Sequence, residues 1–116
     1  MEIDHTLAAL ADPTRRALLE QLSRGEARVT ELAAPFEMSL NAVSKHIRIL
    51  ERARLVKRRI AGREHYLSFN AAALNEAASW IESQRNAWNT RLDALEAMLR
   101  AEDAFDAARQ PERKKP

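Results

Sequence analysis

Apolar residues recur at helical spacing through most of the chain, and this period breaks between residues 55 and 69. The segments 55–60 and 65–69 flank residues 61–64, which contain Gly62. Two short apolar segments joined by a glycine turn are typical of a β-hairpin, and the sequence shows only one convincing case. We therefore expect a set of helices with one small hairpin.

The amino-acid composition also favours a mainly helical fold. The chain contains 22 alanines against 12 Val, Ile and Thr residues together, and 2 glycines. Alanine loses least on entering a helix, whereas β-branched residues lose side-chain freedom there. Because 116 residues is the size of one compact domain, we assign residues 1–108 to a single domain. The last segment, 109–116, lacks apolar periodicity and is expected to be a flexible basic tail.

Several functional classes are excluded by what the sequence lacks. Without cysteine there can be no disulfide, no iron–sulfur cluster, no thiolate zinc site and no cysteine nucleophile. No apolar run is long enough to cross a membrane, and the amino terminus does not resemble a secretory signal. We expect a soluble cytoplasmic protein with no membrane partner.

An enzyme is also not expected. Ser44, Lys45 and His46 are neighbours on a helical segment and point in different directions, so they cannot form a nucleophile and its base. The two glycines lie too far apart for a glycine-rich phosphate loop. The sequence therefore predicts neither catalytic residues nor a cofactor.

Helix-start and helix-stop signals predict four helices before the hairpin and one after it. Asp12 and Pro13 form a cap and a helix-start proline, and Gly25 is expected to end that helix in a left-handed conformation. Thr30 and Ser39 are the expected caps of the next two helices. The expected helices cover residues 3–11, 13–24, 31–36, 40–53 and 72–100.

Positive charge is concentrated in one segment. Residues 39–63 hold eight Lys and Arg against Glu51 alone, a net charge of +7, whereas the whole chain has +2. Such a segment fits a polyanion partner, because each cation placed near a phosphate can release a condensed counterion. A solvated basic face is the simpler alternative, and charge alone does not separate the two.

The charged segment coincides with a recognisable arrangement of elements. In the helix after Ser39, the residues Val43, Ile47 and Leu50 define a buried stripe, so the polar and basic residues must face outward. Two short helices followed by a basic hairpin predict a winged helix-turn-helix with the order α-α-α-α-β-β-α, in which one helix enters the major groove of DNA. A winged helix used only for protein contacts is the alternative.

This arrangement predicts two kinds of DNA contact. The exposed amino-terminal half of the recognition helix should meet base edges, and cations around it should hold phosphates. The expected base contacts are Leu40, Asn41, Ser44 and Lys45, and the expected backbone contacts are Thr14, Arg15, Arg48, Arg52, Arg59 and Arg63.

Three segments then resemble the ArsR/SmtB family of bacterial transcriptional regulators. They are LADPTRRALL at 10–19, MSLNAVSKHIRILE at 38–51 and GREHY at 62–66. The resemblance covers about residues 3–100. It implies a homodimeric repressor that binds an imperfect palindrome, dimerises through its first and last helices, and is released from DNA by an inducer, often a metal.

Two departures from the family pattern matter. Many members carry Gly where this chain has Arg54, and if that position still needs a positive φ the arginine costs on the order of 1 kcal/mol. The metal-sensing members carry Cys pairs in the helix matching 30–36, or Asp and His ligands on the last helix. This chain has no Cys, and residues 72–100 contain no His. We therefore expect no metal site, since His5 has only sparse acidic neighbours.

Apolar residues at heptad spacing on the last helix predict the dimer interface. We expect the first helix to close over the same seam, and we expect Trp88 to lie in the dimer core. The expected interface residues are Ile3, Leu7, Leu10, Leu74, Ile81, Trp88, Leu92, Leu95 and Leu99. A small-molecule inducer bound near Trp80 and Trp88 is the alternative that the sequence leaves open.

Overall fold

The structure, a computed structural model, describes residues 2–109, and the basic tail predicted from residue 109 onward lies almost entirely outside these residues. The described chain divides into two compact units, with the boundary between Ser79 and Trp80. Its elements are α1 (Glu2–Leu10), α2 (Pro13–Leu22), β1 (Ala27–Arg28), α3 (Val29–Ala33), α4 (Leu40–Arg52), β2 (Val56–Ala61), β3 (Glu64–Phe69) and α5 (Ala71–Arg109).

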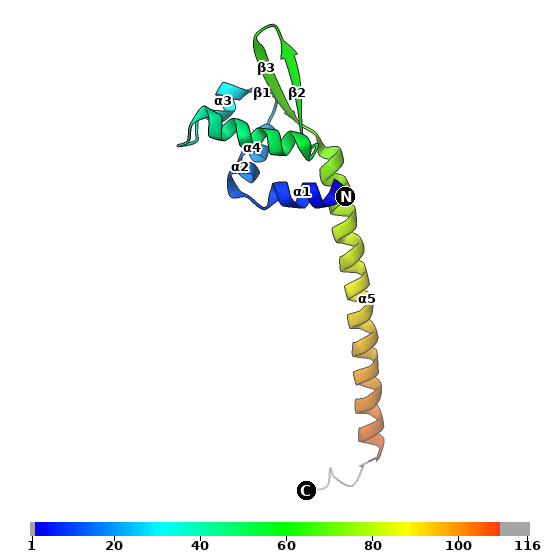
Figure 1. The fold of residues 1–116 in the computed structure, drawn as a ribbon. Coiled ribbons are helices and arrows are strands. Elements are labelled where there is room, and N and C mark those ends of the chain that lie inside the picture. Colours follow the sequence, from blue (N-terminus) through cyan, green and yellow to red (C-terminus); the bar gives the residue numbers. More distant parts are fainter. Residues whose placement is uncertain (1, 110–116) are drawn as a thin grey trace. The chain divides into compact units, whose positions relative to one another are not determined.

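The first unit contains α1 to α4, the three strands and the beginning of α5 (Figure 1). The predicted hairpin is present as β2 and β3, which pair antiparallel from Val56 opposite Phe69 to Ala61 opposite Glu64. The strand β1 adds to the other edge of β3 and completes a three-stranded sheet in the order β1-β3-β2. The sequence did not predict β1, because two residues carry no period.

The core of the first unit lies between the helices and the base of the hairpin. The largest fully buried side chains come from α2, α3, α4 and the strands, and they include Leu18, Leu32, Ile47, Leu50, Leu55 and Leu67. Burying such a side chain is worth about 1.5–3 kcal/mol. The predicted stripe of Val43, Ile47 and Leu50 is buried as expected, which fixes the opposite face of α4 toward solvent.

The predicted ends of α2 and α3 are wrong, and α3 also ends at Ala33, before the predicted residue 36. The helix α2 ends at Leu22, where the Ser23 N–H donates to the Leu19 carbonyl, and Gly25 has a φ of 153°, far from the left-handed helical conformation. The helix α3 begins at Val29 with Arg28 as its cap residue, so Thr30 lies inside the helix. The Glu31 carboxylate accepts a hydrogen bond from the Arg28 N–H at 2.9 Å, so the side chain of Glu31, and not that of Thr30, bonds the backbone at the start of this helix.

The turn after α4 places Arg54 in a left-handed conformation, with a φ of 62°. The Arg54 N–H donates to the Glu51 carbonyl and the Leu55 N–H donates to the Leu50 carbonyl. This pair of hydrogen bonds is a Schellman motif, in which glycine is the usual residue at the position of Arg54. The turn sends the chain from α4 directly into β2 and buries Leu55.

The second unit contains the part of α5 from Trp80 onward. The helix runs to Arg109, beyond the predicted end near residue 100, because residues 101–109 include four alanines and no glycine or proline. Its large apolar side chains are about half exposed or more. Within residues 80–109, the described part of this unit, the helix has no apolar partner.

Candidate nucleic-acid interface

The helix α4 presents a polar face beginning at its first turn. The Ser39 hydroxyl accepts a hydrogen bond from the Ala42 N–H at 3.1 Å and caps the helix as predicted. Leu40 is 50% exposed, Asn41 and Lys45 are also exposed, and Ser44 is half-buried. The four predicted base-contact residues therefore lie together on the amino-terminal half of α4.

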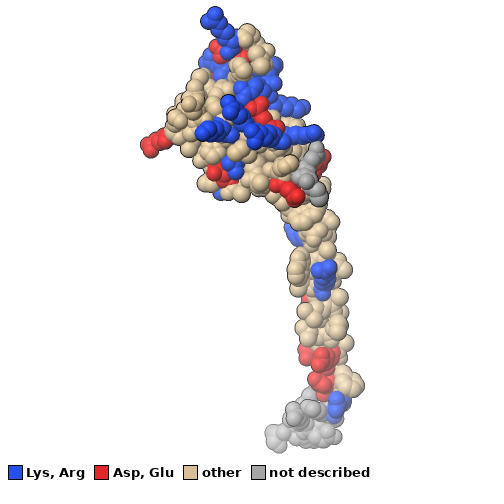
Figure 2. Space-filling view, viewed as in Figure 1, with Lys and Arg blue, Asp and Glu red and all other residues tan. Residues whose placement is uncertain are grey.

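The hairpin β2–β3 forms the wing and carries cations along one strand. In β2 only Val56 is buried, while Lys57, Arg58 and Arg59 are exposed. At the tip Gly62 has a φ of 63° and is followed by Arg63, which is exposed. Figure 2 shows Lys and Arg side chains gathered over α4 and the wing, with few acidic side chains between them. This face combines a helix of groove-fitting size with a basic ribbon.

An ion pair joins the wing to α4. The Arg58 guanidinium donates to both oxygens of Glu51, at 2.7 and 3.1 Å, and Nη1 of Arg58 lies 2.9 Å from Nδ1 of His65. The side chains of Arg58 and Glu51 are 28% and 27% exposed. The hydrogen bond to Glu51 raises the pKa of Arg58. Because the pairing is bidentate, it fixes an orientation as well as a distance.

A second ion pair connects the wing to the turn before β1. The Arg59 guanidinium lies 2.7 Å from Oε1 of Glu26 and stands over the Tyr66 ring, 4.4 Å from its centroid. The Arg59 hydrogen bond lowers the pKa of the Glu26 carboxyl. The predicted phosphate contact at Arg59 is therefore already next to a carboxylate, with which a phosphate would compete.

Arg15 is placed inside the fold. Its guanidinium donates to the carbonyls of Ala9 and Ala8, at 2.8 and 3.1 Å, and lies 3.2 Å from Nδ1 of His46. The side chain is 13% exposed. These contacts join the end of α1 to α4, so the guanidinium of Arg15, which the sequence assigned to the DNA backbone, is held within the fold.

The amino end of α2 is capped as the sequence predicts. The Asp12 carboxylate accepts hydrogen bonds from the N–H groups of Thr14 and Arg15, at 2.8 and 3.1 Å. The Arg15 N–H contributes most to a lowered pKa of Asp12. Thr14, another predicted contact to the DNA backbone, is half-buried in this first turn.

Two further predicted contacts to the DNA backbone, Arg48 and Arg52, are exposed in the carboxyl-terminal half of α4.

The sequence reasoning missed several residues of this face. Lys57 and Arg58 were counted in the charge of the segment but not among the contacts. The sequence did not indicate that Glu51 and Glu26 pair with Arg58 and Arg59, because they lie 7 and 33 residues away from these arginines. Only the alternation of β2 could have shown that Lys57 and Arg59 share one face of the hairpin.

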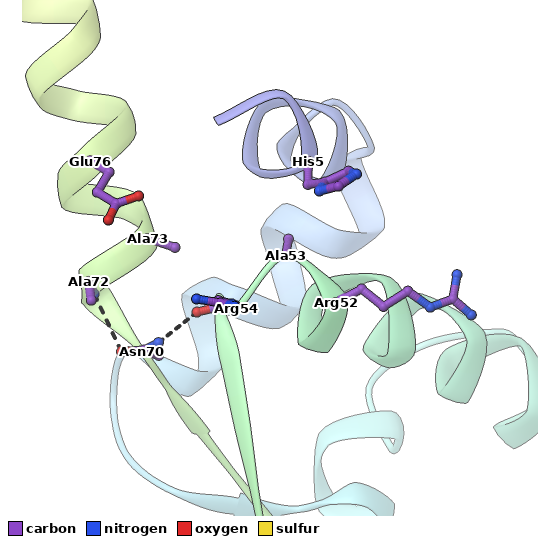
Figure 3. A pocket seen from close by; sticks show the side chains of 8 residues that line it. All are labelled: His5, Arg52, Ala53, Arg54, Asn70, Ala72, Ala73 and Glu76. Carbon is purple, nitrogen blue, oxygen red and sulfur yellow. Dashed lines mark hydrogen bonds between the residues drawn. The ribbon is translucent and has the colours of Figure 1, made fainter. Parts of the chain in front are cut away.

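A small cavity of about 140 Å³ lies in the first unit, where α1, the end of α4 and the first turn of α5 meet (Figure 3). Asn70 closes one side, since its amide donates to the Arg54 carbonyl at 2.7 Å and its side-chain oxygen accepts from the Ala72 N–H. His5, Arg52, Arg54 and Glu76 supply the polar lining. Trp80 and Trp88 are not among the residues that line it.

Residues 2–109 contain neither a cluster of metal ligands nor a membrane-spanning helix. No group of three or more His, Cys, Asp or Glu residues within this range could hold a metal ion. No helix within the same range is long and apolar enough to span a membrane.

Known proteins share this fold and parts of this sequence. A family model described as a helix-turn-helix domain matches residues 10–59. The chain is 29% identical to the transcriptional repressor SdpR of Bacillus subtilis over 79 residues, which are 68% of this chain and 88% of that protein. It is 49% identical over 59 residues to the regulator Rv2034 of Mycobacterium tuberculosis, covering 51% of this chain and 55% of that protein.

Solved structures extend this similarity over most of the chain. One ArsR family transcriptional regulator is 37% identical with a TM-score of 0.74, covering 77% of this chain and 98% of that one. An ArsR-like regulator from Rhodococcus sp. RHA1 is 32% identical with a TM-score of 0.75, covering 84% and 92%.

Proposed function

The chain belongs to the ArsR family of winged helix-turn-helix transcriptional regulators, and we propose that it is a repressor that binds an imperfect palindrome as a homodimer. Its family and fold are those of DNA-binding regulators, not of enzymes. The repressor role is supported by the similarity to SdpR, which is named as a repressor. Its place of action is the cytoplasm, where such a protein meets its operator.

One observation carries the proposal. The exposed half of α4 bears Asn41 and Lys45, and the adjacent wing bears Lys57 and Arg63. Both elements are needed by a protein that reads a major groove and holds the neighbouring backbone, and the +7 charge falls on these two elements.

The proposed contacts divide into base readers and phosphate binders. Leu40, Asn41, Ser44 and Lys45 form the base-reading set, since they lie at the exposed amino end of α4. The phosphate-binding set is drawn from exposed cations further along α4 and along the wing. It consists of Arg48, Arg52, Lys57, Arg59 and Arg63, with Thr14 at the start of α2, and it leaves out Arg15.

The homodimer is supported by the exposed apolar side chains of both units, each considered separately. In the first unit Leu7 is 38% exposed, and Ile3, Leu10 and Leu74 are half-buried. In the second unit the predicted interface residues Ile81, Trp88, Leu92, Leu95 and Leu99 are 50 to 59% exposed. Contiguous exposed apolar surface of this kind marks interaction sites in soluble proteins.

Selection of bound sequences from a pool of random duplex DNA tests the proposal. We expect enrichment of an imperfect palindrome whose half-sites are centred about one helical turn, or a multiple of it, apart. Recovery of no preferred sequence, together with binding that does not depend on salt, would favour a winged helix that binds protein instead.

We further propose that DNA release does not use a metal. The reason is the donor set: thiolate and imidazole are the ligands that zinc and similar ions prefer, and this chain has no Cys and three separated His. Operator affinity should stay the same with a chelator or with stoichiometric zinc. Tight zinc binding that also releases the operator would overturn this part of the proposal.

A further inference from the structure

Two neighbouring arginines of the wing form ion pairs that differ in burial. The side chains of Arg59 and Glu26 are 57% and 40% exposed, whereas those of Arg58 and Glu51 are 28% and 27% exposed. Arg58 lies directly opposite the buried Leu67 in the β2–β3 register. Because successive side chains of a strand alternate between the faces of a sheet, Arg58 lies on the face that packs against the core and Arg59 lies on the other face.

Each of the three nitrogens of the Arg58 guanidinium has a partner. Nε and Nη2 donate to the two oxygens of Glu51, and Nη1 lies 2.9 Å from Nδ1 of His65. A guanidinium can only donate, so Nδ1 of His65 accepts and the ring proton is on Nε2. These contacts commit Arg58 to the fold, and they set it apart from the exposed arginines that are proposed to bind phosphates.

The Arg58–Glu51 pair connects the recognition helix to the part of the wing that leaves the core. Glu51 lies in the last turn of α4, and the buried Leu55 and Val56 hold the base of β2 beside that turn. All five residues of β2 after Val56 are classed as exposed, and Figure 1 shows the wing projecting beyond α4. Arg58 is the second residue after Val56, so its ion pair holds the strand where the apolar packing ends.

We propose that the Arg58–Glu51 ion pair positions the wing, so that Arg63 at its tip and the base-reading end of α4 contact one duplex at the same time. This inference rests on the DNA binding of the proposed function. Arg58 and Glu51 are positioning residues, because they act through Arg63 and not by their own contacts with DNA. A wing that must first be ordered contributes less to affinity than one already held in place.

Removal of a carboxylate separates this role from simple charge. Loss of an acidic side chain beside a basic face is expected to strengthen DNA binding, because the face becomes more positive. Glu26→Gln should show this increase. Glu51→Gln makes the same change in charge but loosens the wing, so it should weaken operator binding by about two- to fivefold. The two variants should therefore change the affinity in opposite directions.

Arg58→Lys tests the geometry at constant net charge. Lysine has no planar fork and cannot hold both oxygens of Glu51 together with His65. Arg58→Lys should therefore weaken operator binding by about as much as Glu51→Gln. If Arg58 bound a phosphate directly, lysine would keep most of that contact as a point charge, and an affinity within about 1.5-fold of the wild type would contradict the proposal.

A double-mutant cycle with Arg63→Ala is the decisive measurement. Binding of the full chain to the operator selected from random duplex DNA, and to its scrambled version, is measured across a salt series. Arg63→Ala should reduce the salt slope by about one unit in the wild type. Combined with Glu51→Gln or Arg58→Lys, it should lower affinity by less than about a further twofold, because the tip of the wing is already misplaced.

Two controls accompany the cycle. Circular dichroism checks that every variant is folded at the temperature of the assay, because an ion pair that only stabilises the fold would leave the effect of Arg63→Ala unchanged. Glu20→Gln makes the charge change of Glu51→Gln at an exposed residue outside the wing. It should not weaken operator binding.

The position of the wing can also be measured without DNA. The natural chain has no cysteine, so spin labels can be attached only at Ala61→Cys on the wing and Ile49→Cys on α4, both of which are exposed. The labelled chain is mixed with an excess of unlabelled chain, so that the distances measured are those within one chain. Glu51→Gln and Arg58→Lys should broaden the distance distribution, and an unchanged width in both would contradict the proposal.

The outcomes distinguish this inference from the proposed function. Stronger operator binding by Glu51→Gln, or a cycle in which the effect of Arg63→Ala is fully additive, overturns the positioning role while DNA binding by the wild type still stands. Equal affinity of the wild type for operator and scrambled DNA, without salt dependence, overturns the proposed function itself.

Discussion

The two units differ in the burial of their large apolar residues. In the first unit Leu18, Ile47 and Leu67 are buried against one another, and the surface left over α4 and the wing is basic (Figure 2). In the second unit Trp88 and Leu95 on α5 remain more than half exposed. Both units are mainly helical, so the difference lies in whether the apolar side chains pack against other residues of the same unit.

This contrast indicates two different partners. A unit whose apolar side chains pack in its own core can have a charged surface. A basic surface is suited to binding the phosphates of DNA. We expect a unit that lacks its own core to obtain one from another chain, because exposed apolar surface is otherwise an aggregation hazard. The dimer and the DNA interface are therefore expected to respond to different substitutions.

The largest effect is expected for Leu95→Asp. It places a carboxylate in the proposed α5 interface in both copies and removes two leucines that dimerisation would bury, each worth about 1.5–3 kcal/mol. The dimer should weaken by about a thousandfold or more. Sedimentation equilibrium of the full chain measures the change.

Thr90→Asp is the matched control, because it adds the same charge to the same helix at a residue outside the proposed interface. It should leave the dimer within about threefold of the wild type. Equal weakening by both substitutions would show that the added charge on α5, and not the loss of an apolar interface residue, disrupts association.

On the DNA side, Asn41→Ala and Lys45→Ala should each cost about 1–3 kcal/mol on the operator, since an amide can pair with an adenine edge and an ammonium with guanine N7 and O6. Each should also relax the preferred base at one position of each half-site. Competitive binding to operator and scrambled duplexes measures both effects.

Arg63→Ala should act differently, because Arg63 lies at the tip of the wing, where it can reach the backbone. It should weaken operator and scrambled DNA alike and reduce the salt slope by about one unit. Arg24→Ala, which removes an exposed arginine outside the proposed interface, is the control. If Arg63→Ala abolishes specificity while Asn41→Ala and Lys45→Ala preserve it, the wing is the reader and the recognition helix is misassigned.

A smaller effect is expected for Arg54→Gly. The left-handed φ of 62° at this position costs a non-glycine residue about 1 kcal/mol, so the free energy of unfolding should rise by up to about that amount. Urea denaturation measures it. Arg54→Ala keeps the backbone penalty and should show no such gain; an equal gain for both variants would assign the effect to the arginine side chain.

The smallest effect is expected for Glu26→Gln. It removes the carboxylate that binds Arg59 at 2.7 Å and leaves the cation available to phosphate. Affinity for any duplex should rise by about two- to fivefold, as for other exposed ion pairs. Glu20→Gln, an equal charge change elsewhere on the first unit, is the control, and an equal rise for both would indicate net charge alone.

Local chemistry explains which elements could be predicted from the sequence. The caps Asp12 and Ser39 and the stripe from Val43 to Leu50 are short-range signals, and the structure confirms all of them. The strand β1 and the cap of α3 could not be predicted, because β1 exists only through pairing with Leu67 and Tyr66 about forty residues later. The hydrogen bond of Glu31 to the Arg28 N–H is local, but it belongs to a helix that begins two residues before the predicted start at Glu31.

The same distinction between local and tertiary interactions applies to the residues of the candidate site. The exposed face of α4 follows from its period, so Asn41 and Lys45 could be placed from the sequence. The orientation of Arg15 could not, because its guanidinium is held by carbonyls at the end of α1 and by His46 on α4. The sequence shows that a residue is a cation, and only tertiary contacts show whether that cation is available.

The salt dependence of DNA binding by the wild-type protein tests the central claim most directly. The dissociation constants for the selected operator and for its scrambled version are measured across a salt series at constant pH. We predict a steep linear fall of log affinity with log salt for both duplexes, with the operator bound more tightly throughout, because exposed cations on α4 and the wing release counterions. Equal affinity for the two duplexes, with a flat salt dependence, would contradict the account.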